Sequence, residues 1–310
     1  MQTNEIIKVE HLVIDFGGFK AVNDISFAVN RGEIFGFLGA NGAGKTTTIR
    51  TLCGLLNPSS GKVYVDGKDV SASTEVLKKN IGYMSQKFTL YPDLTVMENM
   101  EFAGSLYRMG SSAVQKRSKE LFSFIGLEKI PSGPVRDLSG GTRQILSLAA
   151  ALIHDPELIF LDEPTAGTSP KTRLDFWNLI KRLAEQDKTI FVTTHYMDEA
   201  ENCGRIVLME RGRIVAMDSP DGLKKRYFPE PIIEISFLRE NLQQKIHDEI
   251  KAKGLGTPSI FGSGLRIISS NKEELQNWLA ERQDILKYKT VPPSLEDVFL
   301  KAISHAEHHN

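Results

Sequence analysis

The sequence predicts an α/β protein whose first domain is built on a parallel sheet and whose second domain is a small α+β unit. Three largely apolar stretches of strand length support the parallel sheet, because strands covered on both faces carry such runs: Ile34–Leu38, Leu158–Leu161 and Thr189–Thr194. A length of 310 residues favours about two domains. After the basic run Lys224–Arg226, short alternating elements begin, so we place the domain boundary between residues 225 and 226.

The composition is that of a globular protein, with 41% hydrophobic and 25% charged residues. The net charge is -1, which disfavours nucleic acid as the main partner. No apolar run reaches membrane-spanning length, and Met1–Glu5 lacks the regions of a signal peptide, so any work at a membrane requires spans from a partner. Cys53 and Cys203 have no metal-ligand spacing, which favours a reduced, cytoplasmic setting.

The N-terminal segment alternates apolar and polar residues, which predicts an antiparallel β subdomain. The expected strands are Ile6–Val13 and Ala21–Val29, with a turn at Phe16–Phe19 between them. Further on, Lys62–Val65 and the Asp66-Gly67 turn predict a hairpin. Phe16 has two interpretations, an ordinary core residue or a stacking surface for an adenine ring.

A glycine-rich stretch follows the first apolar strand and fills every fixed position of the phosphate-binding pattern G-x-x-x-x-G-K-[ST]. A helix is expected directly after it, over Lys45–Leu52. Backbone N–H groups and the helix N-terminus would surround a polyphosphate, with Lys45 at the β- and γ-phosphates and the Thr46 hydroxyl on Mg²⁺. The alternative is a tight turn that binds nothing. The candidate nucleotide-binding residues here are Gly39, Ala40, Asn41, Gly42, Ala43, Gly44, Lys45, Thr46 and Thr47.

A helical insertion is expected at about residues 88–137, after a short strand over Ile81–Gln86. Its helices are predicted at Val96–Met109 and Ala113–Ile125. Behind it, a second glycine motif opens a helix over Gln144–Ile153. Ser139 suits an N-cap, and the bare N–H groups of Gly140 and Gly141 indicate a second anion site, unless the motif is only a flexible cap.

Polar side chains appear where two buried strands end. Asp162 and Glu163 follow Leu158–Leu161, and His195 follows Thr189–Thr194. Ligands of doubly wound sheets bind beyond the carboxyl ends of the strands, so these residues should face the phosphate loop. We assign Asp162 to the metal, Glu163 to the general base for the attacking water, and His195 to the γ-phosphate and that water.

The second domain alternates strands and helices and contains no catalytic constellation. Strands are expected at Ile232–Phe237, Leu265–Ser269 and Ile285–Thr290. Helices are expected between and after them, over Leu242–Ala252, Lys272–Ala280 and Ser294–Ile303. We therefore expect an accessory α+β domain over residues 226–310, with a role in regulation, dimerisation or partner contact.

Taken in order, these motifs resemble the nucleotide-binding subunit of an ATP-binding cassette (ABC) transporter over roughly residues 5–225. The LSGGTRQ element, Leu138–Gln144, separates this family from other phosphate-loop ATPases. Three further segments resemble the bacterial ABC-2 type exporters, including the drug-efflux group: Tyr83–Phe88, Asp93–Asn99 and Pro293–Leu300. The resemblance implies a phosphate-loop, RecA-like ABC ATPase core that binds ATP and Mg²⁺.

The resemblance also implies roles and partners. Phe16 matches the aromatic that stacks on adenine, and Gln86 matches the glutamine that touches Mg²⁺ and senses the membrane partner. Ser139, Gly140 and Gly141 match the signature that caps the γ-phosphate held by the opposite subunit. The implied partners are a second nucleotide-binding subunit, identical or not, and an ABC-2 type transmembrane permease. The chain would lie peripherally on the cytoplasmic face of the inner (plasma) membrane.

The sequence departs from the family in one loop, where Thr168-Ser169-Pro170 replaces the usual Leu-Asp-Pro. Ser169 in place of aspartate is either a tolerated variation or a sign of weakened coupling between two ATP sites. Two other classes of function stay open, a soluble non-transport ABC ATPase and a regulatory nucleotide-binding module. The transported compound cannot be inferred, because its path belongs to the permease.

Overall fold

The computed structural model describes residues 4–72, 74–87, 89–127, 129–230, 232–237, 242–269, 271–282 and 284–307. Phe88, with which we began the helical insertion, lies outside these residues. The chain divides into two compact units, Met1–Pro220 and Asp221–Asn310. The boundary expected after residue 225 falls inside helix α8 (Pro220–Tyr227). In the part of the chain that is described, no helix has the length and apolar character needed to cross a membrane.

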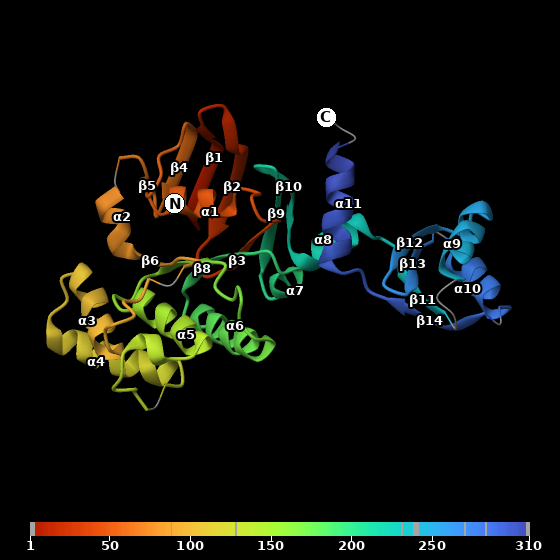
Figure 1. The fold of residues 1–310 in the computed structure, drawn as a ribbon. Helices are drawn as coiled ribbons and strands as arrows, with labels where there is room; N and C mark the ends of the chain where they lie inside the picture. The colour runs from red at the N-terminus through yellow and green to blue at the C-terminus, as the bar shows by residue number, and fades with distance from the viewer. Residues whose placement is uncertain are drawn as a thin grey trace. The chain divides into compact units, whose positions relative to one another are not determined.

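A six-stranded sheet forms the centre of the first unit, in the order β10-β9-β3-β8-β7-β6. Its strands from β9 to β6 are parallel, and only β10 runs antiparallel to its neighbour. Because β3, β8, β7 and β6 are parallel neighbours, the segments that follow them meet at one edge (Figure 1). The strands are β3 (Ile34–Leu38), β6 (Ile81–Met84), β7 (Leu158–Asp162), β8 (Thr189–Thr194), β9 (Arg205–Glu210) and β10 (Arg213–Asp218).

An antiparallel sheet of order β2-β1-β4-β5 covers one side of this layer. Its strands are β1 (Glu5–Phe16), β2 (Phe19–Asn30), β4 (Ser60–Val65) and β5 (Lys68–Asp69), and helix α1 (Lys45–Leu52) contacts both sheets. The core between them contains a cluster of aromatic rings, in which Phe27 packs on Phe35, Phe37 and Phe191. Burying such large rings fixes the phosphate-loop strand β3 against its neighbours.

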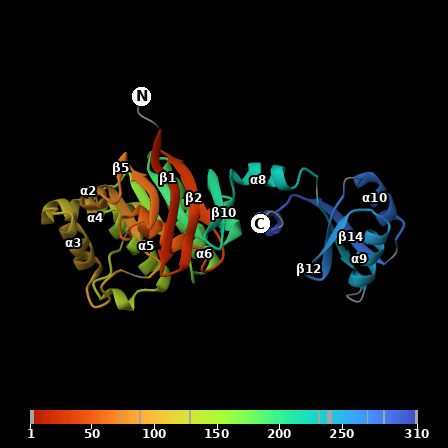
Figure 2. The same ribbon diagram turned by 90° about the horizontal axis from the view of Figure 1, so that it is seen from above.

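Helices α5 (Gly140–Ala151) and α6 (Pro170–Ala184) cover the other side of the parallel sheet (Figures 1 and 2). The predicted helical insertion is present as α3 (Val96–Leu106), α4 (Ser111–Phe124) and the short 3-10 turn η1 (Val135–Asp137). It lies at the end of the unit away from β10 in both views. Two shorter helices, α2 (Thr74–Asn80) and α7 (Met197–Ala200), complete this unit.

Several boundaries differ from those expected. Helix α5 starts at Gly140 rather than Gln144, because the Ser139 hydroxyl caps Thr142 N at 3.1 Å. Strands β1 and β2 extend to a two-residue turn in which Gly17 and Gly18 both have positive φ. The strand expected over Ile81–Gln86 ends at Met84, so Gln86 lies in the following loop.

The accessory unit has the order β12-β13-β11-β14, antiparallel throughout, with the β-α-β-β-α-β connectivity of ferredoxin-like folds. The strand missed by the sequence is β12 (Thr257–Phe261), an edge strand whose Pro258 weakens the strand signal. Helices α9 and α10 pack one face of the sheet through Ile246, Ile250, Leu275 and Leu279. The remaining elements are β11 (Ile232–Phe237), α9 (Gln243–Ala252), β13 (Gly264–Ile268), α10 (Lys272–Ala280), β14 (Ile285–Val291) and α11 (Leu295–Glu307).

Candidate active site

The phosphate loop joins β3 to α1 through a backbone path that only glycine fits. Gly44 has φ 108°, and a Cβ there would lie 2.4 Å from the Ala21 carbonyl oxygen. A Cβ on Gly39 would lie 2.3 Å from the Met209 carbonyl oxygen. Gly39 and Gly44 therefore allow the loop to lie directly against β2 and β9, which leaves its N–H groups available to a ligand.

Lys45, the first residue of α1, turns back across this loop. Its Nζ donates to the carbonyl oxygens of Gly39 at 2.8 Å and Ala40 at 3.1 Å. It also lies 3.1 Å from Glu163 Oε1, and the two side chains are only 3% and 7% exposed. A buried charge needs a partner, so each group neutralises the other.

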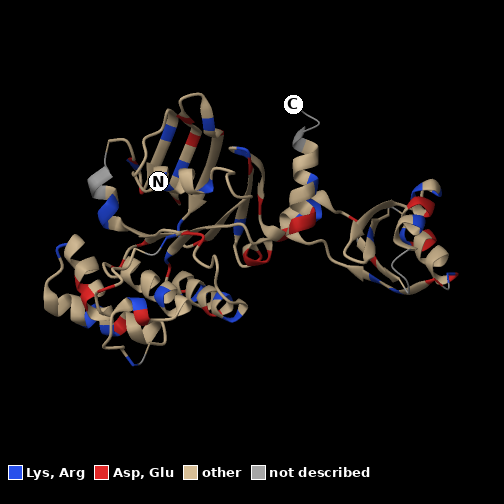
Figure 3. Ribbon diagram, in the orientation of Figure 1, with Lys and Arg blue, Asp and Glu red and all other residues tan. Residues whose placement is uncertain are grey.

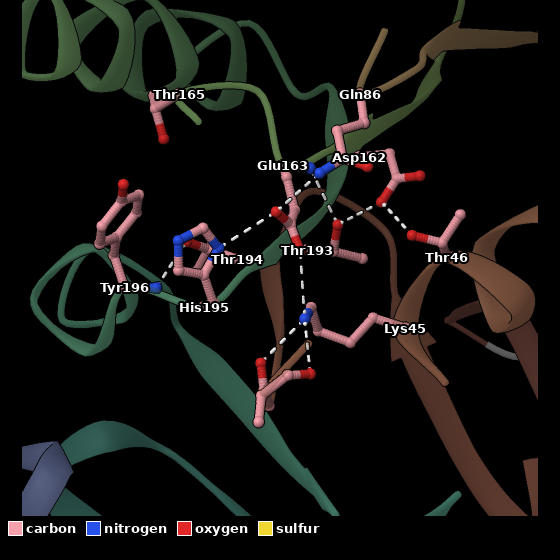
Figure 4. Close-up of polar contacts among 12 residues, drawn as sticks. Lys45, Thr46, Gln86, Asp162, Glu163, Thr165, Thr193, Thr194, His195 and Tyr196 are labelled. Atoms are coloured by element: carbon pink, nitrogen blue, oxygen red, sulfur yellow. Dashed lines mark hydrogen bonds and ion pairs between the residues drawn. The ribbon is translucent and has the colours of Figure 1, made fainter. Parts of the chain in front are cut away.

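Glu163 is the point at which the ends of three strands meet (Figure 4). Its Oε2 accepts from Gln86 Nε2 at 3.1 Å and lies 3.1 Å from His195 Nδ1. Gln86 follows β6, Glu163 follows β7 and His195 follows β8. Glu163 has φ 47°, a left-handed conformation, and its N–H is held by Thr193 Oγ1 at 2.9 Å. The structure thus brings together Glu163, His195, Gln86 and Lys45, the four residues for which we expect catalytic roles.

Asp162 lies beside this group and faces the start of α1. Its Oδ1 accepts from Thr193 Oγ1 at 2.7 Å and from Thr46 Oγ1 at 3.2 Å. Burial raises the pKa of the Asp162 carboxyl, and the two hydroxyl hydrogen bonds partly oppose that rise. A hydroxyl and a carboxylate oxygen side by side form a donor set that suits Mg²⁺, which takes few protein ligands and completes its shell with phosphate and water.

A cavity of about 430 Å³ opens in front of the loop. Phe16 lines it and is 54% exposed, so the core interpretation of this residue is wrong. Phe19, which pairs with Phe16 across the hairpin, also lines the cavity and was not predicted. The other lining residues are Ala21, Asn41, Gly42, Gly44, Lys45, Thr46, Thr47, Gln86 and Glu163.

The signature segment is not part of this cavity. The described residues that line the cavity do not include Ser139, Gly140 or Gly141. They open α5, and Gly141 lies against α6, where a Cβ would come 3.0 Å from Thr172 Cγ2. Ser139 and the phosphate loop are therefore not brought together within one chain.

Ser169 caps helix α6, a role that the sequence did not predict. Its hydroxyl accepts from Thr172 N at 3.2 Å, and Pro170 follows at the first helical position. An aspartate could cap in the same way, so Ser169 keeps the local fold and removes only a negative charge.

Sequence reasoning also missed a group of partners around Glu199. This carboxylate is buried and contacts Thr165, Thr194 and Arg173. No sequence motif marks these four positions. The one local signal is an acidic residue, Glu199, shortly after His195.

Comparisons with known proteins agree with this geometry. Residues 22–166 match the family model described as ABC transporter. The chain is 38% identical over 287 residues to the Nod factor export ATP-binding protein I of Burkholderia lata, covering 92% of this chain and 93% of that protein. It is 43% identical over 247 residues to the probable multidrug ABC transporter ATP-binding protein YbhF of Escherichia coli K12, covering 78% of this chain but only 42% of that relative's length.

Solved structures give the same assignment. An ATP-binding cassette of an ABC transporter in its ADP conformation superposes with a TM-score of 0.64 and 28% identity, covering 71% of this chain and 93% of that one. A dimeric cassette in a post-hydrolysis state, bound to ADP and Pi, gives 0.63 and 28%, covering 69% and 98%. The predicted fold class is thereby confirmed. On its motifs, its fold and its relatives, this chain belongs to the ATP-binding proteins of the ABC transporter family.

Proposed function

We propose that this chain is the ATP-hydrolysing subunit of an ABC-2 type exporter and powers a separate membrane permease. The observation that carries the proposal is the convergence of Lys45, Gln86 and His195 on Glu163 at the mouth of a cavity lined by the phosphate loop. The names of the relatives, multidrug ABC transporter and Nod factor export, support export as the direction.

In this proposal, ATP displaces Glu163 from Lys45. The γ-phosphate takes the position beside the Lys45 ammonium, because a phosphate dianion attracts it more strongly than one carboxylate does. Glu163 then accepts a proton from a water molecule while the water oxygen bonds to the γ-phosphorus and the bond to the β-phosphate oxygen breaks, giving ADP and phosphate. His195 holds the γ-phosphate and the water in line.

Thr46 and Asp162 would hold Mg²⁺, with Gln86 as a third candidate ligand. The bound ion would neutralise charge on the β- and γ-phosphates. The side chains of Thr46 and Thr193 donate to Asp162 and keep that carboxylate oriented toward α1.

A second nucleotide-binding subunit completes the site in this proposal. Ser139, Gly140 and Gly141 do not reach the cavity of their own chain, yet they present N–H groups and a helix N-terminus. A facing copy would place them on the γ-phosphate, so ATP would hold two chains together. The adenine would stack on Phe16 at the rim.

The permease would dock beside Gln86 on the helical insertion. Three large apolar side chains are exposed there: Tyr91 at 47%, Phe102 at 40% and Leu106 at 67%. Tyr91 and Phe102 form an edge-on pair with ring centroids 4.6 Å apart. Such a surface favours a protein partner, and the chain would then lie peripherally on the cytoplasmic face of the inner membrane.

We further propose that the nucleotide-binding domain spans residues 1–225, with its helical subdomain at about 88–137, and that residues 226–310 form an accessory domain. Acidic and basic residues are interspersed over each unit, which supports a protein rather than a nucleic acid partner (Figure 3).

Co-expression with a candidate ABC-2 type permease tests the proposal. We expect the two to purify together and to hydrolyse ATP faster than the chain alone, because docking beside Gln86 favours the closed dimer. A chain that hydrolyses ATP at the same rate with and without that protein, and does not bind it, would contradict the exporter assignment.

Ser169 provides a separate test of coupling between the two sites. Ser169→Asp retains the N-cap and restores the charge found in the family. If coupling is weakened in this chain, the Hill coefficient for ATP in the assembled complex rises in the variant. An unchanged Hill coefficient would identify Ser169 as a neutral variation, and Ser169→Asn, which caps without charge, serves as the control.

A further inference from the structure

Glu199 bears a buried charge that the proposed mechanism leaves unused. It belongs to the short helix α7, a few residues after His195, and its side chain is 1% exposed. A carboxylate removed from water is strongly destabilising unless its oxygens are hydrogen-bonded and its charge is balanced. The partners of Glu199 therefore indicate what it is for.

Both carboxylate oxygens are occupied by groups that flank the catalytic residues. Glu199 Oε1 accepts from Thr165 Oγ1 at 2.5 Å, and Thr165 lies two residues after Glu163. Glu199 Oε2 accepts from Thr194 Oγ1 at 2.7 Å, and Thr194 directly precedes His195. One carboxylate thus ties the loop after β7 to the end of β8.

Arg173 balances the charge and extends the network. Its Nε lies 3.2 Å from Glu199 Oε1, and its guanidinium carbon lies 3.8 Å from the centre of the Tyr196 ring. The Tyr196 ring in turn lies 4.1 Å from the ring of His195, between centroids. The His195 ring therefore packs on Tyr196, and Tyr196 packs on the same arginine that neutralises Glu199.

The network has no direct access to the nucleotide. Among the described residues that line the 430 Å³ cavity, none is Thr165, Arg173, Thr194, Tyr196 or Glu199. An effect of these residues on hydrolysis would therefore pass through Glu163, which lines the cavity, and through His195, which contacts Glu163. Arg173 lies on α6, which begins at the Ser169 cap, so the network also reaches the loop that departs from the family.

We propose that Glu199 is a positioning residue for ATP hydrolysis, which sets the spacing between the base Glu163 and His195 and is held in place by Arg173. This inference rests on the proposed ATPase function. Misplacing a catalytic group by about 1 Å costs up to about a hundredfold in rate, whereas ground-state nucleotide contacts are untouched.

The test is Glu199→Gln in the full chain assembled with its membrane partner. The amide retains the size of the side chain and removes the charge and one acceptor oxygen. We expect kcat to fall roughly tenfold or more, while the affinity for MgATP, measured by titration, stays within about twofold. Arg173→Met should give the same split, and Arg173→Lys should recover part of the rate. Glu120→Gln, which breaks an exposed pair with Arg117 on α4, is the matched control and should leave both quantities unchanged.

Two results would overturn the inference. A wild-type kcat in Glu199→Gln would show that the carboxylate positions nothing, and losses of kcat and affinity that both follow the fraction of unfolded protein would show a purely structural role. If the Glu199 variants do not fold, Thr165→Val removes one hydrogen bond at nearly constant volume and must show a lower kcat with unchanged affinity. Glu163→Gln, measured in parallel, distinguishes failure of the proposed function from failure of this inference. Normal turnover in that variant would refute the ATPase mechanism rather than the role of Glu199.

Discussion

The two units use similar ion pairs in different surroundings. In the first unit, Lys45 and Glu163 lie 3.1 Å apart with exposures of 3% and 7%, and both line a cavity. In the accessory unit, Arg266 lies 3.1 Å from Glu234 and 2.9 Å from Asp297, with exposures of 15%, 17% and 19%.

The difference lies in what the charges can still bind. Arg266 is already engaged with its own unit, because it donates to both carboxylates and its guanidinium carbon lies 3.5 Å from the centre of the Phe261 ring. Asp297 also accepts from Ser294 N at 2.8 Å, so it fixes the start of α11. Within the Pro293–Leu300 motif, Ser294 and Asp297 therefore have a structural role, because they join the start of α11 to Arg266. Lys45 and Glu163, by contrast, line a cavity, and in our proposal ATP opens the pair.

Breaking the pair in the first unit should have the largest effect. Lys45→Met removes the cation that we assign to the phosphates, so the affinity for ATP should fall by about a hundredfold, an order set by charge-assisted phosphate contacts. It also leaves Glu163 without its ammonium partner, which should lower the melting temperature of the nucleotide-free chain. Isothermal titration with MgATP measures the first effect, and wild-type affinity would contradict the assignment.

Breaking the network in the accessory unit should change stability alone. Arg266→Met leaves two half-buried carboxylates with fewer partners and should cost about 1–3 kcal/mol of unfolding free energy, less than for a fully buried pair. ATP affinity should be unchanged, since every residue assigned to the site belongs to the other unit. Denaturant unfolding compares this loss with that of Lys245→Met. Lys245 is exposed and lies 3.9 Å from Glu249, so its loss should stay below about 0.5 kcal/mol. A loss of ATP affinity in Arg266→Met would remove the distinction between the units.

At neutral pH, the smallest effect is expected from a half-buried histidine outside both networks. Burial lowers the pKa of His154 from 6.5 to about 4, although the Ile81 carbonyl opposes this shift. The unfolded chain therefore binds more protons between these values, so this residue makes stability fall as the pH falls from about 6.5 to about 4. His154→Phe keeps the ring that stacks on Tyr107 and should flatten that part of the pH profile of the melting temperature. An identical profile in the variant would contradict the assignment of the shift to His154.

Much of the fold and of the candidate site could be predicted from the sequence, because the segments that carry the chemical motifs also carry clear strand and helix patterns. The apolar runs of β3, β7 and β8 predicted their bounds almost to the residue, and the phosphate-loop pattern leaves little freedom in the backbone. Strand order then placed Glu163 and His195 at one edge. β9 and β10 were not predicted, although β9 carries the apolar run Ile206–Met209, itself a strand signal.

What was missed depends on tertiary contacts. β12 is a polar edge strand that is paired on one side only, so its residues carry no alternation to detect. The Glu199 network joins residues from α6, β8, α7 and the loop after β7, and the Lys45–Glu163 contact joins α1 to the same loop. The position of Phe19 in the cavity wall follows from its pairing with Phe16, which only the structure shows.

The most direct test of the central claim is the ATP turnover of Glu163→Gln in the assembled complex. The amide keeps the shape of the side chain but cannot take a proton from water, so we expect MgATP to bind with undiminished affinity and the dimer to stay closed. Hydrolysis should fall by about a thousandfold, within the range that general-base catalysis contributes. Turnover at the wild-type rate would mean that Glu163 is not the base and that the convergence of Lys45, Gln86 and His195 on it serves another purpose.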